Sequence, residues 1–225
     1  MTLCIRADRV LPDTETEFAP GAVVVAGAHI AWVGPAADAP DADETVDLGA
    51  ATLTPGLVNA HVHLDLSHLR GRLPYRGDFA QWIDGVRGAR AEAGVAAAAA
   101  QLLDDAVKRG TTTFGDIVAP ESFDAMVSVW AAAGVRARLF VEALGFRPEV
   151  ADHVFAEVWE LVEMRELPET LRTGISPHAP YSVSRELLAQ LVAVADGHGR
   201  PLAIHVGETL EELAFIRHGI GPLRE

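Results

Sequence analysis

The sequence has little cysteine, little positive charge and no long apolar run, and each shortage excludes a class of protein. Cys4 is the only cysteine among 225 residues, so we expect no intrachain disulfide and no thiolate metal cluster, as suits a reducing compartment. Eighteen basic residues stand against 32 acidic ones, and the net charge of -14 disfavours nucleic acid as a partner. No segment offers about 18 uninterrupted apolar residues, so we expect no membrane span and a cytoplasmic location.

What the sequence does contain divides into two blocks. Its 49% hydrophobic content is enough to bury a sizeable core. Residues 1–54 carry short β-type runs with Gly27 at a hairpin turn, which predicts a small antiparallel β unit. From residue 55 to 225, short apolar strands alternate with helical segments, the pattern of βα units around a parallel sheet.

The predicted elements of the second block follow one another closely. Strands are predicted at 56–64, 111–117, 135–142, 172–178 and 201–206. Helices are predicted at about 95–109, 122–133, 150–166 and 184–198, with a further one beginning in "ETLEELAFIRHG". Ser184 is the expected N-cap of the helix that it precedes, because its hydroxyl can accept from an unpaired backbone N–H.

The stretch "LVNAHVHLDLSH" (residues 57–68) places histidines inside the first of these strands. Side chains alternate across a strand, so His61 and His63 share one face near its C-terminal end, where barrels of βα units place their chemistry. His205 occupies a similar position in "PLAIHVGE". Three imidazoles at one end of a sheet are suited to one divalent cation.

The simpler interpretation is that such histidines are hydrogen-bonded core or surface residues, since an HxH pattern alone is a weak signal. His63, His178 and His205 all fall at or near the C-terminal ends of predicted strands, which favours a shared site. His68 and His198 are interpreted as ordinary loop and helix residues.

Three motifs in order, "TPGLVNAHVHLDLS", "SPHAPYSVS" and "AIHVGET", resemble the amidohydrolase superfamily and its metal-dependent purine and nucleoside deaminases. The forms "NAHVHLDLS" and "FVEALGF" are most similar to the aminodeoxyfutalosine deaminases of menaquinone biosynthesis. The resemblance implies an α/β fold with a distorted (βα)8 TIM-type barrel, of which residues 55–225 supply about strands 1 to 5. Residues 1–54 would form part of a small N-terminal β-sandwich.

The resemblance also implies roles for individual residues. His61, His63 and His205 correspond to metal ligands, Glu208 to the proton carrier between water and the ring nitrogen N1, and His178 to a substrate contact.

Two further residues are candidates for contacting substrate. Glu142, at the end of the third strand, could bind substrate hydroxyls, the alternative being a solvated or salt-bridged carboxylate. Trp82, with Phe79, could wall a purine pocket, the alternative being a core anchor of its loop.

Lysine is as scarce as cysteine, and this bears on the metal. Binuclear members of the superfamily resemble one another in bridging two metals with a carbamylated lysine, whereas the single lysine here, Lys108, lies at the end of a helix. We therefore expect one divalent metal per site, zinc or iron, bound by imidazoles.

The predicted function is metal-dependent hydrolytic deamination of an adenine nucleoside, most specifically 6-aminodeoxyfutalosine, with release of ammonia. The alternatives are a chlorohydrolase or guanine deaminase of the same superfamily, and a non-catalytic half-barrel. A complete barrel needs about 250 residues, so we expect this chain to be a piece of a longer polypeptide that carries the family's remaining histidine and aspartate ligands. The expected partner is a small molecule, with no nucleic acid and no membrane, and a homo-oligomer is left open.

Overall fold

The computed structural model describes residues 1–90 and 93–224. The chain divides into two compact units, Met1–Gly56 and Leu57–Glu225. The boundary expected from the sequence, after residue 54, lies close to this division. The assignment of the units to a sandwich portion and a barrel portion stays a prediction.

The first unit is a small β structure whose main sheet has the strand order β4-β3-β1-β5. Its strands are β1 (Thr2–Ala7), β3 (Gly21–Ala26), β4 (His29–Pro35) and β5 (Glu44–Asp47). β3 pairs antiparallel with both β1 and β4, whereas β5 pairs parallel with β1. The prediction of a purely antiparallel unit is therefore wrong for β5, because residues 36–43 carry the chain across to the far edge of the sheet. A second, parallel pair joins β2 (Arg9–Val10) to β6 (Thr52–Leu53).

Glycine and cysteine have simple roles in this unit. Gly27 lies in the turn between β3 and β4 with a φ of 59°, a left-handed conformation that favours glycine. Cys4 is a free, buried thiol that packs with Ala22 and Val24 beneath Trp32. The single cysteine therefore acts as a small apolar core residue.

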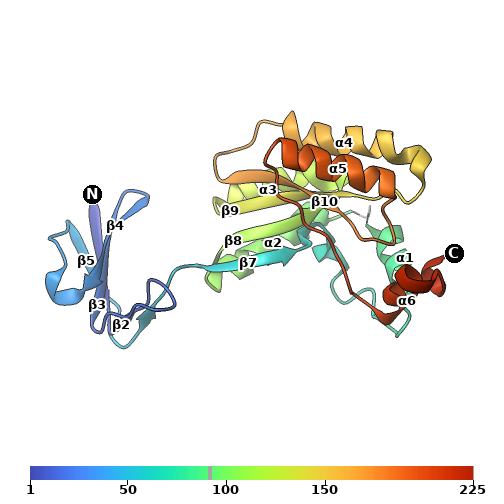
Figure 1. Cartoon of the computed structure of the whole chain (residues 1–225). Coiled ribbons are helices and arrows are strands. Elements are labelled where there is room, and N and C mark those ends of the chain that lie inside the picture. The colour runs from blue at the N-terminus through green and yellow to red at the C-terminus, as the bar shows by residue number, and fades with distance from the viewer. Residues whose placement is uncertain (91–92, 225) are drawn as a thin grey trace. The chain divides into compact units, whose positions relative to one another are not determined.

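The second unit is built on a parallel sheet with the order β10-β9-β8-β7. Its strands are β7 (Leu57–Val62), β8 (Thr111–Val118), β9 (Arg136–Ala143) and β10 (Leu171–Pro177). Figure 1 shows the strands side by side, with helices α4 and α5 over one face. The α/β class and the first four predicted strands are confirmed.

Helices follow the strands in alternation. The four complete helices that were predicted are confirmed as α2 (Val95–Lys108), α3 (Phe123–Ala133), α4 (Ala151–Glu163) and α5 (Arg185–Gly197), and the further helix expected in "ETLEELAFIRHG" is confirmed as α6 (Leu210–His218). The helix that was not predicted is α1 (Phe79–Ala89), and the 3-10 turns are η1 (Ala36–Asp38), η2 (Leu64–Leu69), η3 (Pro120–Ser122), η4 (Pro148–Val150) and η5 (Pro222–Arg224). Across the described residues, no helix is long and apolar enough to cross a membrane.

One continuous core joins α2 to α5 with one face of the sheet. Trp130 and Phe123 of α3, Leu139 of β9, Val158 of α4 and Leu187 of α5 are all buried in it. The helix ends agree with local sequence: Ser184 Oγ accepts from the backbone N–H of Leu187 at 3.1 Å, as expected of an N-cap.

The predicted strand at 201–206 is not regular. It forms an isolated bridge between Leu202 and Ile175, and the backbone N–H of Ala203 donates to the Ile175 carbonyl at 3.0 Å. The segment therefore runs extended along the edge of β10. Its side chains still alternate, because Ala203 and His205 are half-buried while Leu202, Ile204 and Val206 are exposed.

Asp116, on β8, is a fully buried carboxylate beneath the end of the sheet. It accepts from the backbone N–H of Leu64 at 2.9 Å and from Trp130 Nε1 at 2.8 Å. Burial raises the pKa of Asp116 to about 7, against the lowering effect of these two donors. The side chain thus ties η2 and α3 to β8 while keeping a titratable group in the core.

The substitution Asp116→Asn should change how stability depends on pH. The folded chain holds the Asp116 proton up to about pH 7, whereas the unfolded chain loses it near pH 4. The unfolding free energy of the wild type should therefore fall as pH rises through this window, by on the order of 4 kcal/mol relative to the variant. Urea unfolding across the window measures the difference. The exposed Asp105→Asn variant should follow the wild type, and parallel curves for the Asp116 variant would contradict this account.

Candidate metal centre

The first two histidines lie at the C-terminal end of β7. His61 is in the strand, and His63 follows it directly as the residue that precedes η2. The predicted strand continued to residue 64, but it ends at Val62, so His63 belongs to the turn instead of the ladder. The two rings approach edge to face with centroids 5.2 Å apart. Strand alternation and the turn together bring both imidazoles to the same side of the strand end.

His205 completes a group of three imidazoles. Its ring centroid is 5.0 Å from that of His61 and 5.2 Å from that of His63. Each of the three residues offers a ring nitrogen within 4.8 Å of the others. The closest pair, His63 Nε2 and His205 Nε2, lies 3.1 Å apart. Two nitrogens bound to one tetrahedral zinc lie about 3.3 Å apart, so the spacing suits a shared cation.

The hydrogen bond on the far side of His205 orients the ring. Nδ1 lies 2.8 Å from the carbonyl oxygen of His178. Because a carbonyl oxygen can only accept, Nδ1 carries the proton and the neutral ring keeps its lone pair on Nε2, which faces His63. This tautomer is the one that a metal ligand requires.

Electrostatics also favour neutral ligands. Burial lowers the pKa of His63 to about 4, and burial together with the neighbouring His205 lowers that of His61. Neutral imidazoles are the form that binds cations. The donor set therefore fits a divalent metal ion at neutral pH.

His178 and Glu142 lie beside this group. His178 follows β10, and its ring centroid is 5.1 Å from that of His205. Its Nδ1 is 2.6 Å from Ser182 Oγ, and its Nε2 is 3.9 Å from Glu142 Oε1. Glu142, His178 and His205 form a second group whose ligand atoms lie within 4.8 Å of one another. The structure thus brings His178 and Glu142 together with the predicted metal ligands.

The sequence did not reveal the partner of Glu142. Arg90, just after α1, donates from one guanidinium nitrogen to Glu142 Oε2 at 2.8 Å and from another to Asp65 Oδ2 at 3.0 Å. Asp65 and Glu142 are 0% and 1% exposed, so both charges depend on this arginine. Burial alone would raise the pKa of Glu142, but Arg90, His178 and His63 together outweigh it and the pKa is lowered. The position of Asp65, two residues after His63, is a sequence signal that this acid lies near the site. Nothing in the sequence indicates that Arg90 is its partner.

Glu208 lies three residues beyond His205, after Gly207, whose φ is 77°. Its side chain is exposed, and Oε2 accepts from the Tyr181 hydroxyl at 2.9 Å. Its charge raises the pKa of His61 and of His178 against the larger effect of their burial. The structure therefore brings Glu208 within electrostatic reach of both histidines.

Trp82 is placed differently from the other candidates. It lies on α1, its Nε1 donates to the Leu73 carbonyl at 3.1 Å, and its ring stacks on Phe79 with centroids 6.1 Å apart. It packs with Leu66 against the buried Leu69. The structure does not bring it together with the histidines, and its contact with substrate stays a prediction.

A cleft of about 500 Å³ borders the site. Its walls are α1, the residues that follow β9, the start of η5, and the segment after β10 that includes His178, Tyr181 and Ser182. Apolar side chains such as Ile83 and Phe146 line it together with Arg87 and Arg147. Its volume lies in the range of small-molecule sites, roughly 300–1,000 Å³.

Curated relatives support the resemblance. The chain is 41% identical to the aminodeoxyfutalosine deaminase of Deinococcus radiodurans over 214 residues, which cover 91% of this chain and 49% of the relative. It is 33% identical to the 5-methylthioadenosine/S-adenosylhomocysteine deaminase of Halobacterium salinarum, covering 83% of this chain and 45% of the relative. The chain thus spans about half the length of the curated relatives it matches.

Solved structures agree on the fold. Helicobacter pylori aminofutalosine deaminase in complex with methylthio-coformycin superimposes with a TM-score of 0.83 at 23% identity, over 98% of this chain and 54% of that one. Atrazine chlorohydrolase TrzN from Arthrobacter aurescens TC1, complexed with zinc, gives a TM-score of 0.81 at 23% identity, over 99% of this chain and 57% of that one. These neighbours imply a TIM-barrel-like α/β fold.

The family model agrees with both sets of relatives. The Amidohydrolase family model matches residues 52–223, which include β7 with its histidines, His178 and Glu208. The chain belongs to the amidohydrolase family.

Proposed function

We propose that the protein catalyses the metal-dependent hydrolytic deamination of an adenine nucleoside, with 6-aminodeoxyfutalosine as the first candidate. The observation that carries the proposal is the group of His61, His63 and His205, whose ligand atoms lie within 4.8 Å of one another, beside Glu208 and His178. The 41% identity to an aminodeoxyfutalosine deaminase supports this substrate over others. The reaction releases ammonia. It is proposed for the whole protein, because this chain spans about half the length of its deaminase relatives.

The architecture proposed for that protein follows from the family. The sheet β7 to β10 and the extended segment 201–206 would be the first five strands of a distorted (βα)8 barrel. Met1–Gly56 would be part of the accompanying β-sandwich. In such a barrel the C-terminal ends of the strands carry the active site, and the three histidines lie at or just beyond such ends.

The three imidazoles would hold one divalent cation, zinc or iron. The single lysine, Lys108, is on α2 and pairs with Asp104, so it does not supply a carbamate bridge for a second metal. When bound, such a cation lowers the pKa of a coordinated water toward neutrality. Choice between the two metals depends on availability more than on these ligands.

The chain's own residues would move the protons. Glu208 would accept the proton of the attacking water and deliver it to ring N1 as the C6 carbon becomes tetrahedral. His178 Nδ1 contacts Ser182 Oγ, and that hydroxyl also donates to the Ala179 carbonyl. The neutral His178 ring therefore donates through Nδ1 and leaves its Nε2 to accept from a substrate N–H or O–H. The cleft beside His178 would hold the purine and its 5′ substituent.

A chlorohydrolase is the second candidate, since solved triazine hydrolases share the fold with TM-scores of 0.81 to 0.83. Those structures are 21–22% identical to this chain, whereas the curated deaminase relatives reach 41% and 33%. Sequence similarity therefore favours loss of ammonia over loss of chloride.

A substrate panel tests the proposed function. The protein expressed from its complete gene, with metal content verified, should release ammonia from 6-aminodeoxyfutalosine and less readily from adenosine, methylthioadenosine and S-adenosylhomocysteine. Guanine and atrazine should be inert. Chloride release from atrazine without ammonia release would replace the proposal with the second candidate.

The substitution Glu208→Gln should lower kcat by about 10²- to 10⁴-fold, because it removes the acid–base group and keeps its shape. Metal content should be unchanged. Glu211→Gln, three residues further on in α6, is the matched control and should retain activity. Full activity of the Glu208 variant, with metal confirmed, would show that another group carries the proton.

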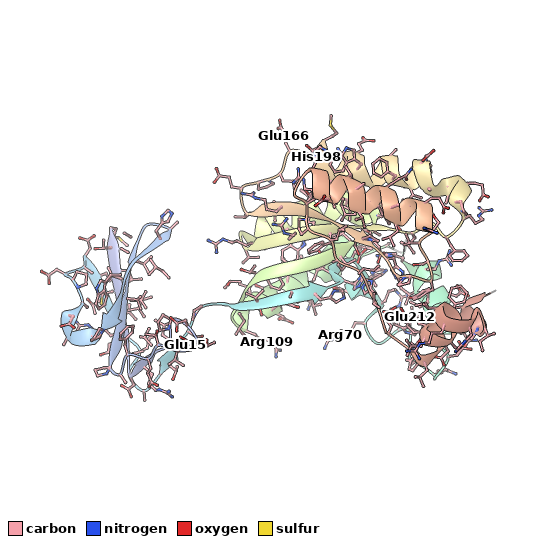
Figure 2. All side chains as sticks on the ribbon, in the orientation of Figure 1. Glu15, Arg70, Arg109, Glu166, His198 and Glu212 are labelled. Atoms are coloured by element: carbon pink, nitrogen blue, oxygen red, sulfur yellow. The ribbon has the colours of Figure 1, made fainter. Side chains whose placement is uncertain are left out.

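The substitution His63→Ala should reduce bound metal well below stoichiometric amounts, because it removes one of the three ligands that these residues supply. His198→Ala is the control, since His198 lies at the end of α5 (Figure 2) and its ring packs on Trp159. Elemental analysis after dialysis measures both. Equal metal content in the two variants would remove His63 from the ligand set.

A further inference from the structure

Glu208 is exposed, yet its position is determined by contacts on both sides of the residue. Gly207, with its φ of 77°, turns the chain just before it. Thr209, just after it, is the N-cap of α6 and accepts from the backbone N–H of Glu212 at 3.1 Å. An exposed carboxylate on an irregular segment otherwise samples several rotamers. The Gly207 turn and the Thr209 N-cap restrict the backbone from which the Glu208 side chain extends.

Glu212 fixes the backbone of Glu208. It lies in the first turn of α6, where Figure 2 labels it, and its side chain is 0% exposed. Its Oε2 accepts from the backbone N–H of Glu208 at 2.6 Å. Its Oε1 is buried and has no hydrogen-bond partner among the described residues. A buried carboxylate is costly, and this one makes its single hydrogen bond to the residue that would carry the proton.

Tyr181 fixes the side chain of Glu208. Its hydroxyl donates to Glu208 Oε2 at 2.9 Å. Its ring is held edge to face by His178, with centroids 5.7 Å apart, and by Phe79, with centroids 6.3 Å apart. The phenol is thus immobilised by packing before it reaches the carboxylate.

We propose that Tyr181 and Glu212 are positioning residues that hold Glu208 in one orientation, with Oε2 occupied by the Tyr181 hydroxyl and Oε1 left to carry the proton. The inference rests on the proposed function, in which Glu208 is the proton carrier. Proton transfer requires the carboxylate oxygen to be held within hydrogen-bond reach of both partners. A hydrogen bond from a fixed donor to one oxygen leaves the other free and directed.

The protonation state of Tyr181 agrees with this role. Burial, followed by the hydrogen bond to Glu208, raises the pKa of Tyr181. The phenol therefore stays protonated and remains a donor throughout the physiological pH range.

The kinetic test compares Tyr181→Phe with Tyr75→Phe in the protein expressed from its complete gene. Tyr181→Phe removes only the hydroxyl and should lower kcat by about 10- to 100-fold, the usual effect of losing a hydrogen bond to a charged group. KM and metal content should be nearly unchanged. Tyr75 is the control, because its ring contacts Trp82 and not His178. Glu212→Ala should lower kcat similarly, whereas Glu212→Gln keeps an acceptor oxygen and should restore it.

A titration tests the contact without any turnover. In the protein expressed from its complete gene, the difference between the ultraviolet titrations of the wild type and of Tyr181→Phe isolates the Tyr181 phenol. Its ultraviolet ionisation should be absent until the chain unfolds in alkali. Adding Glu208→Gln should lower the pKa of Tyr181, because it removes the hydrogen bond, while burial keeps that pKa above the ordinary value of about 10.

The outcomes separate the two proposals. Unchanged kcat in Tyr181→Phe, or ordinary Tyr181 ionisation with Glu208 present, would overturn the positioning role. If the wild type releases no ammonia from any nucleoside, the proposed function fails, and the titration alone decides whether Tyr181 binds Glu208.

Discussion

The candidate site depends on the guanidinium of Arg90, which holds two buried carboxylates in place. It joins two carboxylates that are 0% and 1% exposed, Asp65 and Glu142. Either charge without its partner would be left buried and uncompensated, at a cost of about 3–5 kcal/mol. Asp65 also accepts from the backbone N–H of Ala119 at 3.2 Å. One cluster therefore connects the ends of β7, β8 and β9, and it does so two residues away from His63.

Much of the second unit could be predicted because its local signals agree with one another. Four strands, four helices and the N-cap Ser184 follow from periodicity and capping chemistry, and the family follows from three motifs in order. Helix α1 was missed, although Asp78 accepts from the backbone N–H of Gln81 at 2.9 Å as an N-cap and apolar residues recur with helical spacing in "FAQWIDGV". These two local signals indicate a helix where the sequence analysis expects a loop that carries Trp82.

Other features of the structure cannot be predicted from local sequence patterns. The partner of Glu142 is 52 residues away in the sequence, and no local pattern identifies which arginine reaches a buried acid. The parallel pairing of β5 depends on where residues 36–43 cross the sheet, which strand propensity does not specify. The irregular course of residues 201–206 shows only in their backbone contacts with β10, because their side chains alternate as in a regular strand. Each is a property of tertiary context, whereas the histidine spacing is a property of the strand itself.

The distance in sequence between His63 and His205 links any bound cation to folding. Their Nε2 atoms lie 3.1 Å apart although the residues are 142 positions apart. The binding group therefore exists only after β8, β9 and β10 have assembled between them, and an unfolded chain would have to close that long loop first. A cation held there would bind the folded chain and not the unfolded one, so its free concentration would add to the stability of the fold. The three histidines would then cross-link β7 to the segment 201–206, which lies along β10.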